Sequence, residues 1–130
     1  MGVWKKHLNI VEARKLSTLF CKDFNISPCM IYYVDAFHNN KYYGMYFESP
    51  PTILMLKRLP NPIGILIHEL THHLEGEAYP IRKSSTHGRN YQLAKQKVIN
   101  WCNKKISSNP DWRKPLQAFQ DEMEMKNFRL

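Results

Sequence analysis

The segment HELTH, residues 68–72, carries two histidines four positions apart and a glutamate directly after the first of them. On a helix, residues i and i+4 lie one above the other, so His68 and His72 can reach one ion at about 2.0–2.1 Å each. Glu69 then lies beside the ion, where its carboxylate can take a proton from a water on the metal. The competing interpretation is an amphipathic helix that carries these residues by chance. Because two unpartnered histidines would be costly to bury in so apolar a stretch, the pattern favours a zinc hydrolase.

A third zinc ligand is expected, because catalytic zinc usually has three protein ligands and one open position. The longer pattern HExxHxxGxxH fails here, since Glu75 replaces its glycine and Ala78 replaces its last histidine. His87 is the best candidate, because it follows a loop and begins the next expected helix, from which it can face the first. A carboxylate from Glu122 or Glu124 in the last helix is the alternative.

The two segments HELTH and HGRNY (residues 87–91) together resemble the SprT-like zinc metallopeptidases, which include the Spartan-type proteases. The signature of that family is HExxH, a short insertion, and then HG followed by an aromatic residue. The matching residues are His68, Glu69 and His72 in the first part and His87, Gly88 and Tyr91 in the second. The similarity covers roughly residues 40–102. It implies a zincin-like fold, one zinc ion on three histidines, Glu69 as the base, and hydrolysis of peptide bonds, for much of the family in proteins attached to DNA.

A strongly basic stretch follows the HELTH segment. The chain has a formal charge of +8, and no Asp or Glu lies between Ala78 and Pro110. Such a stretch favours a polyanionic partner, nucleic acid above all, through release of counterions, although a solvated basic helix face is equally common. The candidate nucleic-acid contacts are Arg82, Lys83, Arg89, Lys95 and Lys97.

Two other functions therefore remain open beside a zinc metallopeptidase. The first is a basic nucleic-acid-binding module in which the metal is structural or absent and no protein is cleaved. The second is a metallohydrolase that cleaves a non-peptide amide. Salt-dependent DNA binding without proteolysis favours the binding module, and only substrate profiling separates the two hydrolases.

Length and composition indicate one intracellular domain that spans residues 1–130. No apolar run approaches the ~20 residues that span a bilayer, and the polar N-terminal sequence does not resemble a secretory signal. We therefore expect a cytoplasmic protein with no membrane partner. The cysteines, Cys21, Cys29 and Cys102, are odd in number and include no CxxC pair, so we expect thiols that act as small apolar side chains rather than disulfides.

Periodicity and turn residues predict an α+β fold, with a small antiparallel β-meander between the first helix and the HExxH helix. The expected elements are a helix at 7–23, strands at 30–34, 41–48 and 52–57, helices at 62–75 and 88–106, and a helical tail from 109. Gly76 is expected to cap the HExxH helix. By the resemblance, one of the last two strands is the edge on which an extended substrate docks.

Apolar spacing also predicts which faces of the helices are buried. The first helix is expected to bury Leu8, Val11, the stem of Lys15, Leu19 and Phe20; the 88–106 helix Tyr91, Ala94, Val98, Trp101 and Cys102; and the tail Leu116, Phe119 and Met123. His73 is expected to lie at the surface or behind the metal ligands. Tyr91 is expected to pack in the core, and Tyr79 to shape the loop after the HExxH helix.

Overall fold

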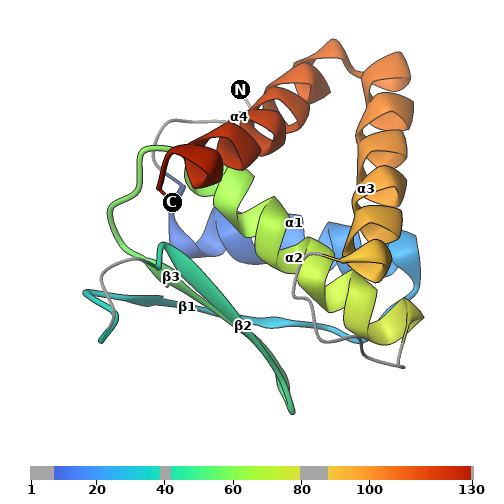
Figure 1. Ribbon diagram of the computed structural model, residues 1–130. Helices are drawn as coiled ribbons and strands as arrows, with labels where there is room; N and C mark the ends of the chain where they lie inside the picture. The colour runs from blue at the N-terminus through green and yellow to red at the C-terminus, as the bar shows by residue number, and fades with distance from the viewer. Residues whose placement is uncertain (1–7, 39–41, 80–87, 130) are drawn as a thin grey trace.

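The computed structural model describes residues 8–38, 42–79 and 88–129, the last seven of them as backbone only. Its elements are α1 (Ile10–Phe24), β1 (Met30–Val34), β2 (Gly44–Glu48), β3 (Pro51–Leu56), α2 (Pro62–Ala78), α3 (Arg89–Ser108), the 3-10 helix η1 (Pro110–Trp112) and α4 (Arg113–Arg129). Helix α2 occupies the centre, with the sheet on one side and α3 and α4 on the other (Figure 1). The predicted α+β class is confirmed. Across the described ranges, every helix is too short or too polar to cross a bilayer.

The sheet is mixed, and the predicted antiparallel meander is wrong. Its strand order is β1-β3-β2, in which β3 pairs parallel to β1 and antiparallel to β2. The turn before Pro51 does form the expected hairpin, with Glu48 opposite Pro51. Strand β3 takes the centre because it is the most apolar of the three, and its Ile53 and Met55 are fully buried. Strand β2 is left at one edge of the sheet.

Helix α1 begins later and faces the core differently from the prediction. It starts at Ile10, after a capping box in which Asn9 and Glu12 exchange side-chain–backbone hydrogen bonds. Leu8 and Phe20 are buried as expected, and Leu19 is partly buried against the core. Val11 is 56% exposed and Lys15 is also exposed, because the buried stripe consists of Ala13, Leu16, Ser17, Phe20 and Cys21. The small residues of that stripe let the helix approach the core closely.

Helix α2 begins as predicted and ends later. Asn61 caps it by accepting a hydrogen bond from the backbone N–H of Gly64, and Pro62 follows at the first helical position. The helix continues past Gly76 to Ala78, so Gly76 is not the predicted C-terminal cap. No described glycine has the positive φ that is typical of such a cap. Glu77 anchors this last turn by accepting hydrogen bonds from the backbone and the hydroxyl of Ser27.

The predicted inner faces of α3 and α4 are largely confirmed. All five residues predicted on α3 are buried. Phe119 on α4 is fully buried and Leu116 packs against the core, whereas the side chain of Met123 lies outside the described part of the chain. The first turn of the tail is η1, and α4 follows from Arg113.

The three cysteines are free thiols. Burial raises the pKa of Cys102 to about 12, and burial together with the neighbouring Cys21 does the same for Cys29. Thiols with such values stay protonated at neutral pH and react slowly, so these residues act as small apolar side chains.

A polar contact joins α1 to α3 beside a cluster of aromatic rings. The indole N–H of Trp101 donates to Asp23 Oδ2 at 2.9 Å, and Lys105 Nζ lies 2.9 Å from the same oxygen. The Trp101 ring also packs edge-on against Phe20 and Trp112, with centroids 5.2 and 5.1 Å away. Burial alone raises the pKa of the Asp23 carboxyl, but the hydrogen bonds from Lys105 and Trp101 and the Lys105 charge leave it below its ordinary value.

We expect Asp23→Asn to lower the free energy of unfolding at pH 7 by about 1 kcal/mol, a modest effect because the Asp23 side chain is 26% exposed. Since the folded-state pKa is depressed, this stabilisation is present above the unfolded-state pKa of about 3.9 and disappears as the pH falls through the folded-state value. Urea denaturation at pH 7 and pH 3 measures the loss of stability and its dependence on pH. Asp35→Asn is the control, because its ion pair with Lys57 is exposed. An equal loss at both pH values would contradict the ionic origin.

Candidate metal centre

The two histidines of the HELTH segment lie side by side on α2. His68 is 1% exposed and the side chain of His72 is 15% exposed. Their ring centroids are 4.9 Å apart, with the planes nearly perpendicular at 82°. Two imidazoles that bind one tetrahedral ion at about 2.0–2.1 Å have centroids about 5 Å apart. The spacing of these rings therefore fits a shared ion.

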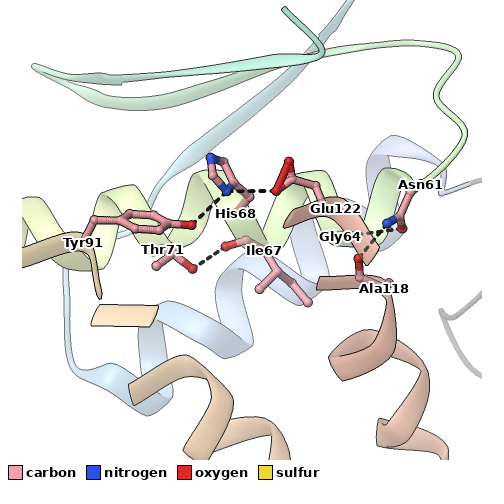
Figure 2. A network of polar contacts seen from close by, with 8 residues as sticks. All are labelled: Asn61, Gly64, Ile67, His68, Thr71, Tyr91, Ala118 and Glu122. Atoms are coloured by element: carbon pink, nitrogen blue, oxygen red, sulfur yellow. Dashed lines mark hydrogen bonds and ion pairs between the residues drawn. The ribbon is translucent and has the colours of Figure 1, made fainter. Parts of the chain in front are cut away.

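Both histidines contact a carboxylate through the same ring atom, Nδ1. His72 Nδ1 lies 3.3 Å from Glu75 Oε1, one turn further along α2. His68 Nδ1 lies 3.0 Å from Glu122 Oε1 of α4 and 2.9 Å from the hydroxyl of Tyr91 on α3 (Figure 2). Metal-bound histidines almost always have such a partner on the second nitrogen. The arrangement assigns Nε2 of each ring as the atom suited to hold a metal.

The carboxylate of Glu69 lies under the start of strand β2. It is 5% exposed, and a Cβ added to Gly44 would stand 3.3 Å from its Oε2 and 3.2 Å from Cγ2 of Ile65. The absence of a side chain at Gly44 thus leaves room for Glu69 between α2 and the sheet. The predicted base is therefore held next to the backbone of the edge strand β2.

Three buried carboxylates lie close to Tyr91, and two of them, Glu75 and Glu122, contact the two histidines. Glu69, Glu75 and Glu122 are 5%, 5% and 1% exposed, and all three act electrostatically on Tyr91. Buried negative charges at such close quarters are unfavourable unless positive charge compensates them. A divalent cation on the neighbouring imidazoles would supply that charge.

The expected third ligand, His87, lies outside the described residues, so the structure does not test it. Within ranges 8–38, 42–79 and 88–129, no three His, Cys, Asp or Glu side chains converge as a complete metal site. The alternative ligand Glu122 contacts His68 at Nδ1, the position of a carboxylate that orients a ligand. The side chain of Glu124 is outside the described part of the chain.

His73 does not lie at the surface, which was one of its two predicted places. It is fully buried, and its Nε2 lies 2.7 Å from the carbonyl oxygen of Ser27. Because a carbonyl only accepts, Nε2 carries the proton and Nδ1 accepts from the hydroxyl of Tyr46, 2.8 Å away. His73 therefore ties α2 to β2 and to the segment before β1. The tyrosine at the middle of a predicted strand was the only signal in the sequence for this contact.

The two tyrosines flanking the site differ in role. Tyr91 is fully buried, as predicted, but its hydroxyl also contacts His68. Burial, with Glu122, Glu69 and Glu75 in that order, raises the pKa of Tyr91, so its phenol stays protonated. Tyr79 ends α2, and the Lys97 ammonium lies 5.1 Å above its ring. That cation–π contact joins the end of α2 to α3.

The candidate nucleic-acid residues are only partly described. Arg82 and Lys83 lie outside the described residues. Arg89 and Lys97 are exposed, and their spacing of eight residues puts them within roughly 80° on one side of α3. Lys95 is partly buried and lies on another side of the helix. Lys104, also exposed, falls on the same side of α3 as Arg89 and Lys97, whereas Lys95 and Lys105 do not.

Comparisons of the chain with protein-family models, with curated proteins and with solved structures gave no match.

Proposed function

We propose that this protein is a zinc metallopeptidase in which His68, His72 and His87 hold one zinc ion and Glu69 is the general base. The observation that carries the proposal is the pair of adjacent imidazoles, each contacted at Nδ1 by a buried carboxylate, with Glu69 buried on the same helix beside Gly44 of β2. The SprT-like resemblance of the two motifs and the charge of the buried carboxylates support the same assignment. A zincin-like arrangement, in which the active helix lies beside an edge strand, belongs to this proposal.

When bound, the ion supplies a Lewis acid that polarises a carbonyl and makes a water more acidic. Glu69 takes the proton of the attacking water and passes a proton to the leaving nitrogen. Its burial between α2 and β2 keeps the carboxylate in one place and excludes bulk water, which strengthens its interaction with the developing charge. His68 and His72 hold their Nε2 atoms in fixed directions through their Nδ1 contacts.

Strand β2 is the edge of the sheet nearest the site and is the proposed docking strand for an extended peptide. Its partner on one side is β3, and its first residue, Gly44, touches the Glu69 side chain. A peptide paired with such an edge gains main-chain hydrogen bonds whatever its sequence. This arrangement favours a protein or peptide substrate over a small amide, because a small amide cannot use the strand.

Binding to DNA is a second candidate function, which the formal charge of +8 favours. Arg89, Lys97 and Lys104 are exposed on α3 and can contact phosphates without reading bases. A protease that acts on DNA-associated proteins would use both features. Cleavage of a basic DNA-binding protein, measured with and without DNA at two salt concentrations, separates the possibilities: salt-dependent DNA binding without cleavage favours a binding module.

The test of the metal centre is the zinc content of the purified protein by elemental analysis. We expect one zinc per chain in the wild type and clearly less in His87→Ala, because a site with two histidines holds the ion more weakly. His38→Ala is the matched control, since His38 is exposed and lies before the active helix. A wild-type protein that binds no zinc would refute the proposed function. Unchanged zinc in His87→Ala would remove only His87 from the ligand set.

A further inference from the structure

Resting on the proposed function, we infer that Glu122 and Tyr91 are positioning residues that hold the His68 ring with its Nε2 directed to the metal. Neither residue belongs to the HExxH motif, and the proposed third ligand is His87. They come from α4 and α3, so the metal ligand on α2 is oriented by two other helices (Figure 2).

The contact between α2 and α4 brings Glu122 to His68 through two matching helical stripes. On α2, Asn61, Gly64 and His68 follow one another along the face that meets α4. On α4, Ala118 and Glu122 are one turn apart, and Asn61 Nδ2 donates to the Ala118 carbonyl at 2.6 Å. The Ala118 carbonyl also lies against Gly64. One turn further along both helices, Glu122 meets His68.

Two contacts at Nδ1 orient the His68 ring. Glu122 Oε1 lies 3.0 Å from this nitrogen, and the Tyr91 hydroxyl forms a hydrogen bond with it at 2.9 Å. When Nδ1 carries the proton, the lone pair of the neutral ring is on Nε2. This is the tautomer that binds a metal through Nε2.

The burial of Glu122 indicates a functional rather than a packing role. A carboxylate that is 1% exposed costs stability unless its charge is compensated, and an apolar side chain would fill this position at less cost. Among the described residues that contact this cluster, His68 and His72 can carry positive charge or hold an ion that does.

The test compares zinc dissociation constants, measured by chelator competition, with the melting temperatures of the metal-free proteins. We expect Glu122→Leu to weaken zinc binding 10–100-fold and Tyr91→Phe to weaken it less, because each substitution removes a polar group that contacts a ligand. The melting temperature of metal-free Glu122→Leu is expected to equal or exceed that of the wild type, since a buried charge has been removed. Asp121→Asn is the matched control, because the neighbouring carboxylate is exposed and contacts Gln117 of the same helix.

Each result decides the inference. Wild-type zinc affinity in Glu122→Leu would overturn the positioning role while leaving the proposed function intact. This holds also if the melting temperature of the metal-free variant is lowered. A loss as large as that of His72→Ala would make Glu122 a ligand and would also overturn it. A wild-type protein without affinity for zinc would instead refute the proposed function itself, and the inference with it.

Discussion

A Glu69→Gln protein is expected to bind one zinc ion with wild-type affinity and to cleave peptide substrates about 10²–10⁴-fold more slowly. Glutamine has nearly the same shape as glutamate, so it fits between α2 and Gly44 without a new clash. It cannot take up the proton of the attacking water, so the attacking water loses its base. Because the three proposed histidine ligands are unchanged, the metal stays bound. The measurement is the initial rate of cleavage of an unfolded protein substrate, with zinc content determined on the same preparation.

Glu77→Gln is the matched control for this substitution. It makes the same change on the same helix, but Glu77 is exposed and contacts Ser27 rather than the histidines. We expect its rate and zinc content to match those of the wild type. If Glu69→Gln with a full complement of zinc turns over at the wild-type rate, the assignment of Glu69 as base is wrong.

The sequence was most informative where structure is local. The HExxH spacing, the cap at Asn61 and the buried stripe of α3 depend on neighbours within a few residues, and the structure agrees with all three. Strand order was not predictable in this way. Short strands joined by turn residues suit a meander, but the pairing was decided by β3, the strand with the most apolar surface to bury.

The surroundings of the metal site were harder to predict than its ligands. His68 and Glu122 are 54 residues apart in the sequence, and their contact depends on how closely α2 and α4 approach. Glu122 was therefore predicted only as one of two possible carboxylate ligands. The contact of His73 with Tyr46 and Ser27 likewise depends on the strand order. No spacing within one helix reveals such partners.

Gly64→Ala is expected to lower the free energy of unfolding by about 1–3 kcal/mol, although alanine is the better helix former by roughly 1 kcal/mol. A Cβ at this position would meet the Ala118 carbonyl well inside 3.0 Å, a separation that real Cβ atoms essentially never show. Because the obstacle is backbone rather than a flexible side chain, α4 must move away from α2. Denaturant unfolding of the metal-free protein measures the loss.

Gly76→Ala is the control that separates the effect of helix propensity on stability from the effect of packing. It makes the same change near the other end of α2, at a partly exposed residue. We expect this control to be at least as stable as the wild type, since it gains propensity. Wild-type stability in Gly64→Ala would show that α2 and α4 do not pack as closely as described.

The displacement of α4 also has a consequence at the metal. If α4 moves, Glu122 moves away from His68, and zinc affinity is expected to fall about 10–100-fold, as in Glu122→Leu. Two substitutions that act through the same contact do not add. The double variant Gly64→Ala/Glu122→Leu should therefore bind zinc about as tightly as the weaker of the two single variants. If the losses of zinc-binding free energy in the two single variants add fully in the double variant, Gly64 and Glu122 support His68 independently. The contact between α2 and α4 would then not link them.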